Sequence, residues 1–161
     1  MTRLAAVPER RATFQEDKTI GALTTVLHTN GRLLFRRPSR LEKITFPPAA
    51  ETIVVDGSRL AITMGDEPPR SVDLDAHPEV AALVEAVRGT LAGDLAALRR
   101  NYAVTMEGSV GAWQLTLRPA DARVAALVRA VAIAGRNTDV QRVDITQANG
   151  DRSVMTITPQ P

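Results

Sequence analysis

Large apolar side chains alternate with polar ones along most of this chain, and this period of two indicates β-strands with one buried face. The alternation is plain around Phe35, which would share one strand face with Leu33 and Arg37. Residues 24–29 are rich in β-branched side chains, which also favour a strand. Strands are expected at residues 14–20, 24–29, 32–37, 41–46, 52–56, 59–64, 102–106, 113–117, 143–145 and 155–157.

Two polar turns join pairs of these strands. Asp56 and Gly57 suit a tight hairpin turn, because glycine accepts a positive φ angle without steric cost. Residues 149–151, Asn-Gly-Asp, have the same character near the C-terminal end. The sequence therefore predicts antiparallel hairpins over residues 52–64 and 143–157.

One long helix is predicted. Pro78 suits a first helical turn and Gly93 suits a C-terminal cap, while Asp94 could begin a second short helix. Apolar residues recur between them at intervals of three and four, which places them on one helix face. This face consists of Val80, Leu83, Val84, Val87 and Leu91.

Two segments have a weaker pattern. The first dozen residues could form a short helix with Leu4 and Val7 on one side. After Pro119 the spacing of Val124 to Val131 fits a helix, yet residues 127–133 also alternate as a strand would. We expect a short helix after Pro119, followed by a strand that ends at Gly135.

These predictions amount to about ten strands and a few short helices, so the fold class is mainly β with an antiparallel sheet whose apolar face must be covered. Two sheets could cover each other as a sandwich, which would leave no cavity. Alternatively, one strongly curved sheet could wrap around its helices as an open barrel. The helix over residues 78–91 would be roughly 20 Å long and would cover only a few strands, so this second arrangement would leave an apolar cavity. Periodicity does not choose between the two.

Composition narrows the class of protein. The 161 residues suit one domain over residues 1–161, and apolar residues make up 44% of them. Cysteine is absent, which excludes disulfides, and no apolar run approaches the ~20 residues of a membrane span. Residues 1–8 lack the apolar stretch of a secretory signal, so the chain is either cytosolic or has had its signal removed.

Catalysis and metal binding have little support. The two histidines, His28 and His77, fall in different expected elements, and no phosphate-binding loop, nucleophile elbow or spaced set of metal ligands occurs. Asp73, Asp75 and Glu79 are better explained as polar residues around a helix start than as a metal site. No cofactor is expected.

Nucleic-acid binding is also disfavoured. The net charge is only +2, so the general pull on polyanions is weak. The one aromatic residue in the cation-rich stretch, Phe35, would lie on the opposite strand face from Arg32 and Arg36, whereas single-strand binding needs both on one face. Arg37 would share the apolar face and needs a polar partner there. The cations of this stretch are Arg32, Arg36, Arg37, Arg40 and Lys43.

Three segments together resemble the LolA-type periplasmic lipoprotein carriers. Residues 14–18 are similar to an F-x-Q-x-x element, with Glu16 where the family favours glutamine. Residues 31–41 match G-x-L-x-x-x-R-P-x-x-[LF], and residues 53–60 match apolar-V-x-D-G-x-x-L. The three occur in the family's order over residues 14–64, and the remaining chain is similar only in its general pattern.

The resemblance implies an incomplete β-barrel with a helical lid over an apolar cavity, and no enzyme activity. Such carriers shield lipoprotein acyl chains in the periplasm and pass them from an inner-membrane donor to an outer-membrane receptor. By the same resemblance, Arg37 would hydrogen-bond towards the lid, and Leu41 would lie at an exposed corner that contacts a partner. We expect a monomeric carrier that does not span the membrane.

We predict the following ligand-binding residues: Leu33, Phe35, Arg37, Val55, Ile62, Leu83, Val87, Trp113 and Leu115. For each apolar one, a place in the ordinary core is an equally good alternative. Other cargo remains open, since related proteins accompany lipid export systems. So does an envelope adaptor or sensor that binds protein or peptide on the same fold, whereas a hydrolase would need a nucleophile and a base in contact.

Overall fold

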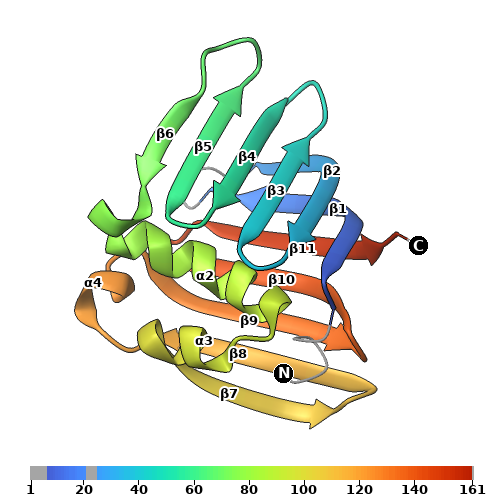
Figure 1. Cartoon of the computed structure of the whole chain (residues 1–161), viewed down its shortest axis with the longest axis vertical. Coiled ribbons are helices and arrows are strands. Elements are labelled where there is room, and N and C mark those ends of the chain that lie inside the picture. The colour runs from blue at the N-terminus through green and yellow to red at the C-terminus, as the bar shows by residue number, and fades with distance from the viewer. Residues whose placement is uncertain (1–6, 21–24, 161) are drawn as a thin grey trace.

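A computed structural model describes residues 7–20 and 25–160 of the chain. Its strands form a single antiparallel sheet of eleven members in the order β6-β5-β4-β3-β2-β1-β11-β10-β9-β8-β7 (Figure 1). Sequential strands are neighbours except β6 and β7, which lie at the two edges of the sheet. The pairing of β1 with β11 joins its two halves. The strands are β1 Glu9–Thr19, β2 Val26–Arg36, β3 Arg40–Thr45, β4 Glu51–Asp56, β5 Arg59–Met64, β6 Arg70–Asp73, β7 Tyr102–Ser109, β8 Ala112–Pro119, β9 Val128–Arg136, β10 Asp139–Gln147 and β11 Arg152–Pro159.

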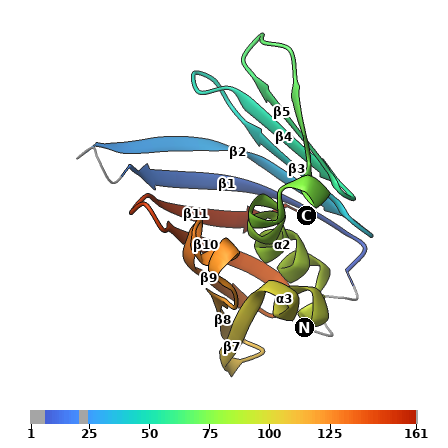
Figure 2. The same cartoon turned by 90° about the vertical axis from the view of Figure 1, so that its left-hand side faces the viewer.

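The sheet is strongly curved but does not close. Its two outer strands, β6 and β7, have a strand partner on one side only within the described residues. The helices lie together on the concave side of the sheet, as the rotated view shows (Figure 2). They are η1 Leu74–Ala76, α2 Pro78–Ala92, α3 Leu95–Asn101 and α4 Ala122–Ala125. The fold is therefore mainly β, an incomplete barrel with a helical lid, and the sandwich alternative does not hold.

The predicted helix signals act where they were expected. Pro78 begins α2, and Gly93 ends it with a φ of 68°, a conformation that favours glycine. The side chain of Asp94 then accepts a hydrogen bond from the Ala97 amide at 3.0 Å and so caps α3. These caps turn the chain sharply, so α2 and α3 lie against each other over the same half of the sheet.

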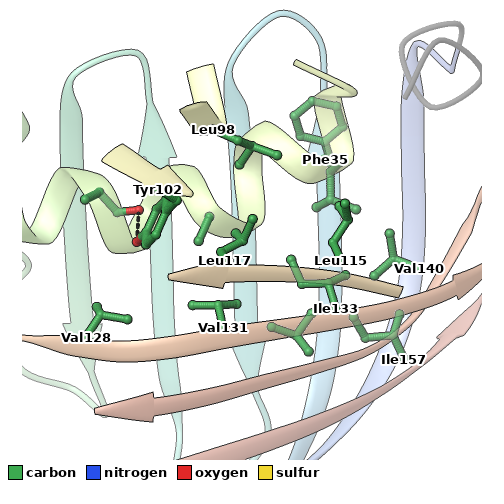
Figure 3. Packing of buried hydrophobic residues seen from close by; sticks show 14 of the residues in the cluster. Phe35, Leu98, Tyr102, Leu115, Leu117, Val128, Val131, Ile133, Val140 and Ile157 are labelled. Carbon is green, nitrogen blue, oxygen red and sulfur yellow. Dashed lines mark hydrogen bonds between the residues drawn. The ribbon is translucent and has the colours of Figure 1, made fainter. Parts of the chain in front are cut away.

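The main core lies between the helices and the β7–β11 half of the sheet (Figure 3). Leu115, Leu117 and Ile133 are fully buried there because β8 and β9 turn alternate residues towards the helices. Tyr102 donates its hydroxyl to the Ala82 carbonyl at 2.7 Å, which ties α2 to β7. Burial raises the pKa of Tyr102, so this hydroxyl keeps its proton at neutral pH. A smaller cluster of Val55, Leu60 and Leu74 lies below the start of α2.

Most expected elements form, and the differences have local causes. The short helix after Pro119 is α4, and the strand that follows it is β9. The expected N-terminal helix is wrong from Glu9 onwards, where β1 begins with alternating burial, and its first six residues lie outside the described part. The two strands expected at 24–29 and 32–37 form one strand, β2, because every one of its residues pairs with β1. The short strand β6 was not predicted.

Gly31 is the point where the sheet can least accept a larger side chain. A Cβ there would lie 1.8 Å from the Ile44 carbonyl oxygen and 2.8 Å from the Phe14 ring. We expect Gly31→Ala to lower the free energy of unfolding by about 1–3 kcal/mol, measured by urea denaturation. Gly111→Ala is the matched control, since its Cβ would meet only the Ser109 hydroxyl at 4.0 Å. Equal effects of the two substitutions would contradict the steric explanation.

Candidate functional site

An apolar cavity of about 240 Å³ lies between α2 and the concave face of the sheet. We call it the α2 cavity. Its roof is the face of α2 that the apolar spacing predicted, because positions three and four apart point the same way. The roof residues are Leu83, Val84, Val87, Thr90 and Leu91.

The floor of the α2 cavity comes from both halves of the sheet. Leu33 and Leu41 come from β2 and β3, and Ile53 and Val55 from β4. Strand alternation directs these residues inward, since Leu41 pairs with Val55 and their side chains share the concave face. The β9–β11 part adds Ile133, Val140, Val143, Ile145, Met155 and Ile157.

A polar group of three side chains interrupts this apolar wall. Glu16 is only 4% exposed and accepts hydrogen bonds from Lys43 Nζ at 2.8 Å and Ser153 Oγ at 2.6 Å. Lys43 Nζ also lies 5.3 Å from the centre of the Phe14 ring, a cation–π distance. A buried carboxylate is tolerated only when it is paired in this way, so Glu16 joins β1, β3 and β11 across the floor.

The ion pair decides the charge of Glu16. Burial alone would raise the pKa of Glu16, but the charge and hydrogen bond of Lys43 and the Ser153 hydroxyl together hold that pKa below its ordinary value of 4.5. A carboxylate whose folded-state pKa is lowered stabilises the fold fully above its unfolded pKa. That contribution is lost as the pH falls through the folded-state pKa.

Glu16→Gln should therefore flatten the acid side of the stability curve. The variant leaves Lys43 without a counter-ion, so we expect the free energy of unfolding at pH 7 to fall by about 3 kcal/mol and to depend less on pH below 4.5. Urea denaturation across pH 3–7 measures both changes. Asp144→Asn is the control. The Arg152 hydrogen bond lowers the pKa of Asp144, but Arg152 is exposed, so we expect a loss below about 1 kcal/mol at pH 7. If the free energy of unfolding of Glu16→Gln fell as steeply as that of the parent between pH 4.5 and pH 3, the acid-dependent stability would not come from Glu16.

Two arginines hold α2 against the sheet. Arg37 Nη2 donates to the Ala92 carbonyl at the C-terminal end of α2 at 2.6 Å, and Arg37 Nε donates to the Val7 carbonyl at 2.8 Å. Arg88, within α2, donates to the Gly57 carbonyl at 2.6 Å and to the Ser39 carbonyl at 3.1 Å. The roof is thus attached to the rim of the sheet by charged hydrogen bonds as well as by apolar packing.

The predicted ligand-binding residues divide between the α2 cavity and other places. Leu33, Val55, Leu83 and Val87 line the cavity. Leu115, Trp113 and Phe35 instead belong to the main core, and Ile62 packs against the smaller one. Arg37 lies at the end of α2 rather than in the wall. A role for any of them in binding stays a prediction.

Leu41 does not lie on the outside of the corner. It is half-buried in β3, packs against both cores and faces the α2 cavity, because its register with Phe35 and Val55 turns it to the concave side. Leu41 thus faces inward, and the expected partner contact through it stays a prediction.

Several wall residues were missed by sequence reasoning. The C-terminal hairpin had been predicted from its alternation, but nothing in the pattern placed β11 beside β1, at the centre of the curved sheet. That pairing brings Val143, Ile145, Met155 and Ile157 into the wall. It also brings Ser153 to Glu16. Alternation in the sequence placed Glu16 on the same strand face as Phe14, but it did not identify the hydrogen-bond partners of Glu16.

Each of the two histidines makes a local contact at the surface. His28 Nδ1 lies 2.5 Å from Asp17 and His77 Nδ1 lies 3.1 Å from the Asp73 carbonyl, and both histidines are exposed. The described residues hold no cluster of three potential metal ligands. Within residues 7–20 and 25–160, no helix is both long and apolar enough to span a bilayer.

The cation-rich stretch is divided between the two faces of the sheet. Arg36 and Arg40 form ion pairs with Glu9, Glu42 and Asp56. Arg37 and Lys43 make the inward hydrogen bonds described above. These four cations are thus used in separate local contacts, and the fifth, Arg32, lies 5.8 Å from the centre of the Phe46 ring.

Comparison with solved structures finds the same fold at low sequence identity. A domain assigned as an outer membrane lipoprotein-sorting protein from Vibrio parahaemolyticus matches at 7% identity and a TM-score of 0.51, over 99% of this chain and 88% of that one. A DUF1329 family protein from Desulfovibrio piger matches at 10% identity and a TM-score of 0.50, over 98% and 86%. A LolA superfamily protein from Nitrosomonas europaea matches at 14% identity and a TM-score of 0.46, over 94% and 84%.

A search of curated proteins gave no match. The family described as "Outer membrane lipoprotein carrier protein LolA-like" matches residues 1–158, nearly the whole chain. This agrees with the motifs at residues 14–18, 31–41 and 53–60 and with the open, helix-lidded sheet. The chain therefore belongs to the LolA-like family of outer membrane lipoprotein carrier proteins.

Proposed function

We propose that this protein is a periplasmic carrier that holds acyl chains of lipoproteins or related lipids in the α2 cavity and delivers them to an outer-membrane receptor. The observation that carries the proposal is the α2 cavity itself, an almost wholly apolar space of about 240 Å³ under a helix. A closed core would have filled that space with side chains, since protein interiors normally pack densely. Family membership supports the same function.

The energetics suit a hydrocarbon guest. Each buried CH₂ group contributes ~0.8 kcal/mol, so a sixteen-carbon chain gains on the order of 12 kcal/mol before ordering costs. This gain explains why a carrier needs a dry cavity to move a lipid through water. The leucine, valine and isoleucine walls offer such an environment, and we propose that Leu33, Val55, Leu83 and Val87 contact the chain.

The size of the α2 cavity implies that α2 moves during loading. A dry apolar cavity of ~150 Å³ binds one benzene molecule in another protein, so 240 Å³ holds only part of a long acyl chain. A whole chain requires α2 to lift from the sheet. The Arg37 and Arg88 hydrogen bonds hold α2 down, so they set part of the free-energy difference between closed and open states.

Native mass spectrometry of the freshly purified full chain, exported to the periplasm, tests the proposal. We expect adducts that organic extraction identifies as lipids with long acyl chains, and loss of those adducts when acceptor membranes carrying an outer-membrane receptor are added. Protein that is free of lipid after periplasmic export and that binds no added acyl probe would contradict it. Binding of unfolded peptide without lipid would favour the envelope adaptor instead.

A further inference from the structure

A second pocket, of about 170 Å³, adjoins the α2 cavity near the C-terminal end of α2. We call it the Arg10 pocket. It is built from the start of β1, the turn between β9 and β10 and the end of β11. It shares four apolar wall residues with the α2 cavity: Leu33, Leu91, Val140 and Ile157. The two spaces therefore adjoin at these four side chains, and movement of these side chains would let a single elongated molecule occupy both.

Arg10 lines this pocket, and two of its hydrogen-bond donors are unpaired in the described part of the chain. Its Nη1 donates to the Thr138 carbonyl, but Nε and Nη2 are shielded from solvent and have no hydrogen-bond partner in the described part of the chain. Shielded donors without partners are rare and cost free energy. Glu9, the acidic neighbour on β1, is already paired with Arg11 and Arg36.

The charges around Arg10 do not satisfy these two donors. Burial lowers the pKa of Arg10, Asp139 opposes that change and Arg37 adds to it, yet Asp139 makes no hydrogen bond with the guanidinium among the described contacts. An arginine remains protonated in a protein. The Arg10 pocket therefore holds a positive charge with two unpaired donors beside the α2 cavity.

We propose that the Arg10 pocket binds the phosphate or carboxylate of an amphiphile whose acyl chain lies in the α2 cavity. This inference rests on the proposed function and narrows its cargo to anionic lipids. A guanidinium fork matches an oxyanion with two parallel hydrogen bonds, and binding in this way requires the Arg10 side chain to turn so that the shielded Nε and Nη2 face the pocket. A cargo without an anionic group would leave both donors unpaired.

The test compares hexadecyl phosphate with hexadecanol, which share one tail, by displacement of the neutral apolar probe N-phenyl-1-naphthylamine from the full chain. We expect the parent protein to bind hexadecyl phosphate more tightly. Arg10→Gln should weaken hexadecyl phosphate about 10- to 100-fold and leave hexadecanol unchanged, which also shows that the variant is folded. Arg152→Gln is the matched control, because Arg152 is exposed, pairs with Asp144 and lines neither the α2 cavity nor the Arg10 pocket, and it should change neither affinity.

Further arms separate the alternatives. Arg10→Lys keeps the charge but not the fork, and it should recover part of the phosphate preference. Equal affinity of the parent for the two amphiphiles, or equal effects of Arg10→Gln and Arg152→Gln, would overturn the anion site while hexadecanol binding still supported the proposed carrier. Displacement of the probe by inorganic phosphate alone would mark a free-anion site and would overturn the amphiphile assignment. Failure of both amphiphiles to displace the probe would count against the carrier itself.

Discussion

Leu83→Glu should weaken the binding of a fluorescent fatty-acid probe by about 100-fold. Leu83 is one of the roof residues of the α2 cavity, on the face of α2 that looks onto the sheet. A glutamate there would place a charge next to the hydrocarbon chain, and no described cation of the cavity wall is free to pair with it, since Lys43 is already bound to Glu16. Probe titration followed by displacement with unlabelled fatty acid measures the loss.

Two controls make this result specific to the cavity. Met106→Glu adds the same charge at an exposed apolar residue of β7 that does not line the α2 cavity, so probe affinity should stay at the parent level. Leu83→Met keeps an apolar side chain of similar volume and should change affinity less than about threefold. If Leu83→Glu is folded by circular dichroism and still binds the probe normally, α2 is not the wall of the binding site.

The fold could be predicted from local pattern because its elements are one-sided. The face of α2 was visible as a spacing of three and four, and the β4–β5 hairpin as alternation around Asp56 and Gly57. Curvature was not visible. Periodicity tells which side of a strand is apolar, but it does not tell whether that side meets another sheet or a helix.

The site was harder to predict than the fold for a related reason. Phe35 and Leu33 lie on the same face of β2, yet Phe35 is buried in the core and Leu33 lines the α2 cavity. What each of them meets depends on the curvature of the sheet and on the pairing of β1 with β11. Neither quantity is encoded in a stretch of ten residues. The sequence thus shows on which face of a strand a side chain lies. It does not show whether that side chain meets the core or the cavity.

The lid can be opened by removing its attachment to the rim. Arg37 donates to the last carbonyl of α2 at 2.6 Å, where the negative end of the helix dipole strengthens the interaction. Arg37→Leu removes that bond and the bond to Val7, while a leucine can still pack at the end of the apolar strand face. We expect the fold to persist and local opening of residues 79–99 to become easier by about 2 kcal/mol. Hydrogen exchange in that segment would then be about 30-fold faster.

Arg36→Leu is the control for this experiment, because Arg36 directly precedes Arg37 at the end of β2, is exposed and pairs with Glu9 on the convex face. Its exchange in residues 79–99 should equal that of the parent.

Arg88→Ala removes the attachment to the Ser39 and Gly57 carbonyls, so combining it with Arg37→Leu should accelerate exchange beyond either substitution alone. A carrier must close firmly enough to exclude water and open readily enough to release its cargo. If exchange were unchanged in Arg37→Leu and in the double variant, the apolar contacts of α2 alone would set the free energy of opening.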